Sequence, residues 1–79
     1  MEYIFSMETT KVKQLIEIGL PNATVTVTGD GDHFDALVIS ESFVGQSMIK
    51  QQRMVMATVN EQILSGELHA LSIKTEIPS

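Results

Sequence analysis

The stretch TVTVTGDGDHFDALVI, residues 24–39, decides the fold because it predicts two strands joined by a tight turn. Threonine and valine alternate strictly over residues 24–28, which is typical of a β-strand with one apolar face. The Gly-Asp-Gly of residues 29–31 tolerates the backbone angles of a hairpin turn. Residues 34–39 are nearly all apolar, which predicts a second, central strand buried on both faces.

A helix is predicted before these strands, beginning near Thr9. Thr9 or Thr10 can cap its start, and Gly19 followed by Pro21 ends it. Residues 1–7 are predicted to form a flexible N-terminal arm.

Two helices are predicted after the second strand. Gly45 breaks the chain, and Ser47 can cap a short helix over residues 48–50. A longer helix follows, with apolar residues at Val55, Val59 and Ile63.

The Ser65-Gly66 pair is a helix stop signal, and it leads into a last strand predicted over residues 68–75. Residues 76–79 are expected to be a short tail. The sequence thus predicts one α+β domain over residues 1–79, in the order α-β-β-α-α-β. The predicted core consists of Leu15, Ile16, Val38, Val55, Val59, Ile63, Leu71 and Ile73.

The two histidines are predicted to meet at one end of the sheet. Helices connect the second strand to the last, which is the connection that parallel strands require. Parallel strands begin at the same end of a sheet. Because His33 directly precedes the second predicted strand and His69 is the second residue of the last, their imidazoles should lie at that end.

Composition limits the function. With 79 residues and 43% hydrophobic content, the chain is one small globular domain. The absence of cysteine excludes a disulfide framework and a thiolate site made by this chain alone, although two histidines could complete a site shared with a partner. The net charge of −5 opposes non-specific binding to nucleic acid. We expect a cytoplasmic protein with no signal peptide, no membrane contact and no catalytic arrangement.

Five segments carry a resemblance to a known family: residues 29–34 (GDGDHF), 37–40 (LVIS), 43–47 (FVGQS), 50–55 (KQQRMV) and 68–72 (LHALS). In this order and at these spacings they resemble the BolA family, in its BolA/IbaG-like group. The resemblance covers nearly all of the chain from about residue 11 to residue 78. It does not extend to the short tryptophan-bearing helix that follows in most family members.

The resemblance implies a class II KH-like fold with a three-stranded mixed sheet packed against helices. It also implies a non-enzymatic adaptor in iron–sulfur cluster trafficking, with a monothiol glutaredoxin as partner. A [2Fe–2S] cluster would be shared between the two proteins, with a glutaredoxin cysteine and a glutathione thiol as ligands. His69 matches the main ligand of the family and His33 the usual second one; the isolated protein is expected to hold no cluster.

Two other functions remain open from the sequence. Residues 45–55 are a helix-turn-helix candidate, in which Lys50, Gln51 and Arg53 are residue types that contact phosphates and base edges. A small DNA-binding regulator of transcription or stress response is therefore the alternative, although a solvated helix face explains the same residues. The third hypothesis is a metal-free interaction domain, in which His69 is only hydrogen-bonded within the fold.

Overall fold

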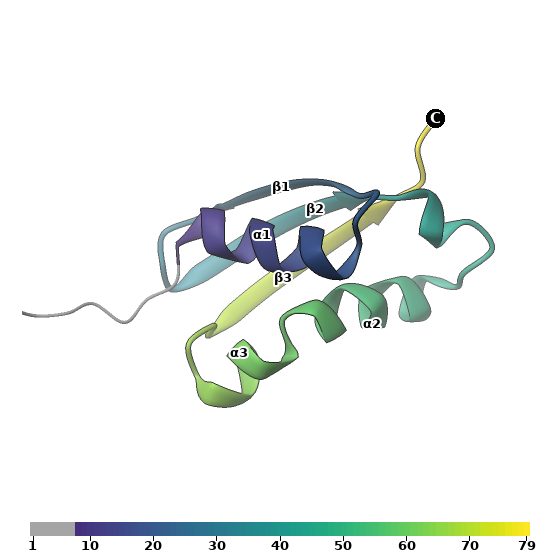
Figure 1. The fold of residues 1–79 in the computed structure, drawn as a ribbon. Helices are drawn as coiled ribbons and strands as arrows, with labels where there is room; N and C mark the ends of the chain where they lie inside the picture. The colour runs from purple at the N-terminus through teal and green to yellow at the C-terminus, as the bar shows by residue number, and fades with distance from the viewer. Residues whose placement is uncertain (1–7) are drawn as a thin grey trace, which may run out of the picture.

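The computed structural model describes residues 8–79, and the predicted arm of residues 1–7 lies outside the described residues. The described chain confirms the order α-β-β-α-α-β and adds one short 3-10 turn (Figure 1). Its elements are α1 (Thr9–Gly19), β1 (Thr24–Gly29), β2 (His33–Ile39), η1 (Glu41–Phe43), α2 (Met48–Thr58), α3 (Asn60–Ser65) and β3 (Ala70–Glu76).

The described strands form one mixed sheet in the order β1-β2-β3. β1 and β2 pair antiparallel, with Val25 opposite Val38, as the predicted hairpin requires. β2 and β3 pair in parallel, with His33 opposite Ala70. The parallel pairing confirms the prediction made from the helical connection between these two strands.

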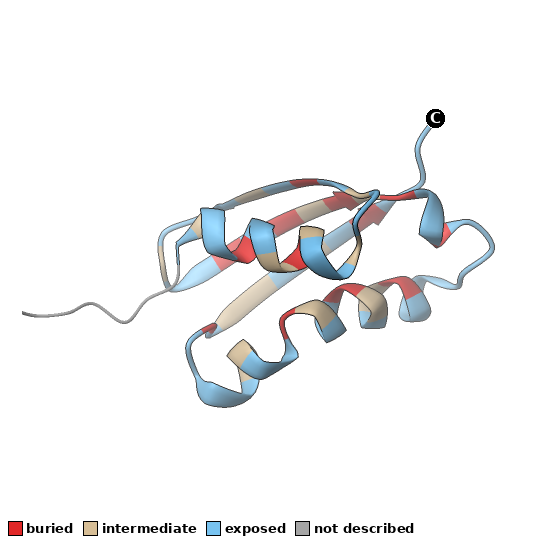
Figure 2. Cartoon of the chain, viewed as in Figure 1, coloured by how far each residue is buried: buried red, intermediate tan, exposed pale blue. Residues whose placement is uncertain are grey.

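The strand β2 is central, as predicted, but the prediction that both of its faces are buried is wrong. Phe34, Ala36 and Val38 are buried, whereas Asp35 is exposed and Leu37 is half-buried. The helices pack against one face of the sheet and leave the other open, so burial alternates along the strand (Figures 1 and 2).

The core lies between the helices and the covered face of the sheet. Four predicted core residues are fully buried: Ile16, Val38, Val55 and Val59. The other four are partly buried at its margin: Leu15, Ile63, Leu71 and Ile73. The largest buried side chains, Phe34 and Phe43, and the buried Leu68 are missing from the predicted core set.

The helix ends agree with the sequence only in part. Glu8, not Thr9 or Thr10, occupies the cap position of α1, and it makes no side-chain capping bond. Ser47 caps α2 as predicted, since its hydroxyl accepts the backbone N–H of Lys50 at 3.1 Å. Gly66 ends α3 with a φ of 86°, a conformation that suits glycine.

The predicted lengths of the second and third helices are reversed. α2 has 11 residues and α3 has six, because the backbone leaves the helical conformation at Val59, where φ is −122°. The side chain of Val59 is nevertheless fully buried. The apolar spacing therefore identified the buried positions but not the break between the helices.

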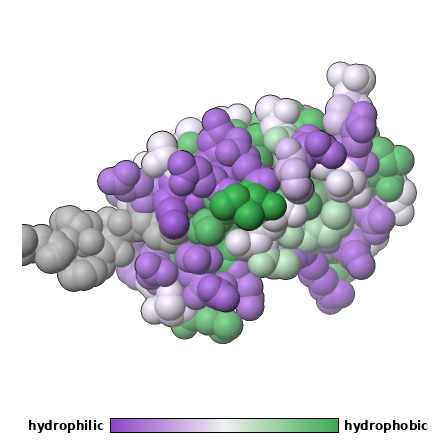
Figure 3. All heavy atoms as spheres, viewed as in Figure 1, coloured by the Kyte–Doolittle hydropathy of each residue, from purple (hydrophilic) through white to green (hydrophobic). Residues whose placement is uncertain are grey.

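On the face seen in Figure 3, hydrophilic side chains surround a group of hydrophobic ones near the middle. Over residues 8–79, no helix has the length and apolar character needed to cross a membrane.

Candidate metal-ligand site at one end of the sheet

The turn between β1 and β2 is built around the side chain of Asp30. One carboxylate oxygen of Asp30 accepts the backbone N–H groups of Asp32 and His33, both at 2.9 Å. These bonds, with that from His33 the stronger influence, hold the pKa of the Asp30 carboxyl below its ordinary value of 3.8. Gly31 completes the turn with a φ of 96°. The turn therefore fixes the backbone that carries Asp32 and His33.

Gly29 allows the two strands to close tightly at this turn. The backbone N–H of Asp30 donates to the carbonyl oxygen of His33 at 3.2 Å. A Cβ atom at position 29 would lie 2.6 Å from that same oxygen, which is closer than real side chains come. A larger residue at this position would displace the start of β2, and with it His33.

His69 lies beside the turn, in the connection between α3 and β3. Its Nδ1 atom lies 2.9 Å from Oδ1 of Asp32. Leu68, only 1% exposed, anchors the connection in the core, and its backbone N–H donates to the carbonyl oxygen of Gln62 at 3.0 Å. The imidazole of His69 is 62% exposed, so its ring can be reached from outside the molecule.

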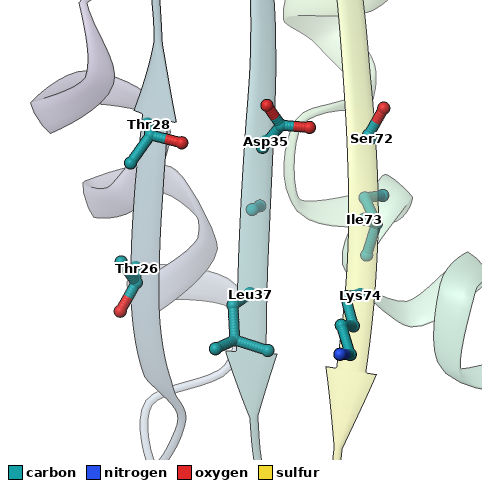
Figure 4. A pocket seen from close by; sticks show the side chains of 8 residues that line it. Thr26, Thr28, Asp35, Leu37, Ser72, Ile73 and Lys74 are labelled. Atoms are coloured by element: carbon teal, nitrogen blue, oxygen red, sulfur yellow. The ribbon is translucent and has the colours of Figure 1, made fainter.

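His33 is the first residue of β2 and faces the open side of the sheet. Its Nε2 atom lies 3.3 Å from the hydroxyl of Ser72 and 3.6 Å from Oδ1 of Asp35. Asp35 and Ser72 are paired across β2 and β3 and stand at the same level on this open face (Figure 4). The surroundings of His33 are thus polar and exposed.

The structure brings the two histidines to one end of the sheet, as predicted from the connection between the strands. His33 opens β2, and His69 immediately precedes Ala70, the register partner of His33. β3 begins two residues later than the predicted Leu68 and ends at Glu76, one residue later than predicted. A hollow beside His69 separates the turn from the α3–β3 connection, and Asp30, Asp32 and Glu67 also line it.

The donor set of this site is incomplete for a metal held by this chain alone. Within residues 8–79, no group of three or more histidine, aspartate or glutamate side chains is arranged to hold a metal ion. Exposed imidazoles do suit part of an iron–sulfur cluster whose thiolate ligands come from elsewhere, as in centres where histidine replaces cysteine on one iron. The chain therefore offers imidazole ligands at this site but no thiolate.

The predicted nucleic-acid residues do not form one surface. Lys50 and Arg53 are exposed on α2, but Gln51 is buried at 7% exposure. The Gln51 amide donates to the carbonyl oxygens of Gln46 and Phe43, at 2.9 and 3.5 Å. The prediction that Gln51 contacts nucleic acid was wrong, because its side chain is hydrogen-bonded to the backbone of the η1–α2 connection. The start of α2 lies at the end of the domain opposite to the β1–β2 turn (Figure 1).

Two partners of the histidines, Asp32 and Ser72, were missed by sequence reasoning. The contact of Asp32 with His69 follows from the pairing register of β2 and β3. His33 is paired with Ala70, so the residues one step earlier, Asp32 and His69, fall side by side beyond the ends of the strands. The contact can be found only once this register is known, and the register was not predicted from the sequence.

The helices packed on one face of a mixed sheet define an α+β domain. The family model described as BolA-like protein matches residues 9–79, and the chain belongs to the BolA family. It is 34% identical over 73 residues to the acid stress protein IbaG of Escherichia coli (strain K12). These 73 residues cover 92% of this chain and 87% of that protein.

Solved structures agree with this assignment. A bolA protein homologue from Coxiella burnetii superposes with a TM-score of 0.81 at 37% identity, covering 91% of this chain and 92% of that one. The SufE-like protein 1 of Arabidopsis thaliana is 37% identical over 51 residues, which is 63% of this chain and 14% of that protein. The BolA domain of Arabidopsis SufE1 has the same fold, with a TM-score of 0.76 at 24% identity, over 89% of this chain and 91% of that one.

Proposed function

We propose that this protein is a non-enzymatic adaptor in cytoplasmic iron–sulfur cluster trafficking. It binds a monothiol glutaredoxin and shares a [2Fe–2S] cluster with it, with glutathione as the source of a further thiolate. His69 is the principal iron ligand from this chain, and His33 assists. Membership of the BolA family and the occurrence of a BolA domain in SufE1 support an iron–sulfur role.

The observation that carries the proposal is the parallel register that gathers His33 and His69 at one end of the sheet. Both imidazoles are more than half exposed, so a partner can approach them. Since the chain contains no cysteine, it offers imidazole but no thiolate. Glutaredoxin and glutathione supply the missing type of ligand, and the isolated chain therefore holds no cluster.

The test mixes the purified protein with a cluster-loaded monothiol glutaredoxin in the presence of glutathione. Size-exclusion chromatography reports complex formation, and visible absorption and circular dichroism report the ligands of the cluster. We expect a heteromeric complex that retains iron and has a spectrum different from that of the glutaredoxin alone. If the two proteins elute separately and the spectrum is unchanged, the proposal fails.

A nucleic-acid function is the second candidate, and the exposed Lys50 and Arg53 favour it. They lie in a stretch, from Val44 to Asn60, that contains no acidic residue. The burial of Gln51 and the net charge of −5 weigh against it. We rank it below the iron–sulfur function for these reasons.

A further inference from the structure

We infer that Asp32 is a positioning residue that orients the imidazole of His69 and fixes which of its nitrogens carries hydrogen. The inference rests on the proposed function in one respect, namely that His69 is a ligand. The carboxylate of Asp32 accepts the Nδ1–H of His69 across 2.9 Å. The Nε2 atom is then left with a free lone pair, and it is the nitrogen that His69 offers to iron.

The other acidic side chains at this end of the sheet contact groups other than the His69 ring. The Asp30 carboxylate accepts backbone N–H groups within the turn. Asp35 lies beside His33, and a carboxylate oxygen of Glu67 accepts the hydroxyl hydrogen of Ser65 at 3.3 Å. Among the described residues, only the carboxylate of Asp32 is within hydrogen-bond distance of the His69 ring.

Backbone interactions, and not contacts of its own side chain, determine the position of Asp32. Its own N–H donates to Asp30, and the parallel register brings position 32 beside position 69. The contact joins residues 37 apart in sequence, so it forms only when β2 and β3 are correctly paired. The carboxylate is thus already in place before a partner arrives.

A carboxylate hydrogen-bonded to a histidine is a recurrent device in metal sites, where it fixes the tautomer and makes the ligating nitrogen a better donor. The Nε2 atom of His33 lies 3.3 Å from the hydroxyl of Ser72, which can either donate or accept, and 3.6 Å from the Asp35 carboxylate, which is too far for a hydrogen bond. The two histidines are consequently unequal. His69 is oriented for ligation, which accounts for its principal role.

The direct test is long-range proton–nitrogen correlation NMR of the ¹⁵N-labelled protein without any metal, at alkaline pH where imidazole is neutral. In the wild type, His69 should be predominantly the Nδ1–H tautomer. Asp32→Ala should shift the ratio of tautomers about fivefold toward Nε2–H, because the acceptor is lost. Asp32→Asn should shift the ratio less than Asp32→Ala does, because its amide can either accept the Nδ1–H or donate to Nδ1. Asp35→Ala is the matched control and should leave His69 unchanged.

A second measurement links the tautomer to the cluster. Asp32→Ala should weaken binding of cluster-loaded glutaredoxin about tenfold, whereas Asp32→Asn should weaken it less. An unchanged His69 tautomer in Asp32→Ala, or unchanged binding despite a changed tautomer, would overturn the inference. Failure of the proposed function has a different signature: either the wild type forms no complex with the glutaredoxin, or His69→Ala forms the same cluster-bearing complex as the wild type.

Discussion

His33 stands opposite Ala70 in the parallel pairing of β2 with β3. This one register determines the whole candidate site. It puts His69 next to the start of β2, brings Asp32 within 2.9 Å of His69, and sets Ser72 beside the ring of His33. An antiparallel pairing would have put the two histidines at opposite ends of the sheet.

The Asp30 turn should depend on an ionised carboxylate. Since hydrogen bonds from His33 and Asp32 lower its pKa in the folded protein, Asp30 should titrate below 3.8, as measured by carboxyl ¹³C NMR. The ionised carboxylate of Asp30 therefore stabilises the folded protein. This contribution is fully present above pH 3.8, the pKa of the carboxyl in the unfolded chain, and it is lost as the pH falls through the lower pKa of the folded protein.

Replacing the same side chain tests the turn at neutral pH. Asp30→Ala should speed the hydrogen exchange of the Asp32 and His33 amides, because both lose their acceptor. Asp35→Ala is the control, since the Asp35 carboxylate accepts neither amide. Equal exchange rates in the two variants would contradict the account of the turn.

Gln51 should behave as a structural residue. Gln51→Ala should lower the free energy of unfolding by about 2 kcal/mol, because three hydrogen bonds of its side chain are lost. The carbonyl oxygen of Gln46 loses its donor, that of Phe43 keeps only the N–H of Gln46, and the hydroxyl of Thr75 loses the amide oxygen to which it donates. Gln52→Ala, which removes a single bond to the carbonyl of Ile73, should cost only about 1 kcal/mol. Urea denaturation measures both, and wild-type stability of Gln51→Ala would show that the side chain is not part of the interior.

Burial should determine the cost of shortening valine. Val59 is fully buried, so Val59→Ala should cost about 2 kcal/mol of the roughly 5 kcal/mol available to a domain of this size. Val44 is 59% exposed, and the same substitution there should cost less than about 0.5 kcal/mol. If thermal denaturation gave equal losses for the two variants, the described core would be wrong.

The nucleic-acid hypothesis predicts a specific dependence on salt. If Lys50 and Arg53 each contact a phosphate, the slope of log affinity against log salt should fall by about 2 in the double alanine variant. We expect only weak DNA binding by fluorescence anisotropy, with no such change. Tight, sequence-selective binding at physiological salt would reverse our ranking of the two functions.

Local patterns in the sequence were enough to predict most of the elements. The alternation of Thr24–Thr28 and the Gly-Asp-Gly turn predicted the hairpin, and the helical connection predicted the parallel pair. The end of α2 could not be predicted, because Val59 continues the apolar spacing while its backbone breaks the helix. The inward position of Gln51 was equally hidden, since its partners lie in the η1–α2 connection and in β3.

The candidate site was predictable in its location but not in its contacts. Topology alone placed His33 and His69 at one end of the sheet. The pairing of Asp32 with His69 depends on the register and on the Asp30 turn, and neither leaves a periodic pattern in the sequence. Contacts between residues far apart in the chain therefore required the structure.

The central claim is that His69 is the principal iron ligand from this chain, and the most direct test is the spectrum of the glutaredoxin complex formed by His69→Ala. Visible circular dichroism of the [2Fe–2S] complex should show a change caused by histidine ligation in the wild type. His69→Ala should abolish that change, and His33→Ala should reduce it less. If the His69→Ala protein forms a cluster-bearing complex with a spectrum identical to that of the wild type, the ligand assignment is contradicted.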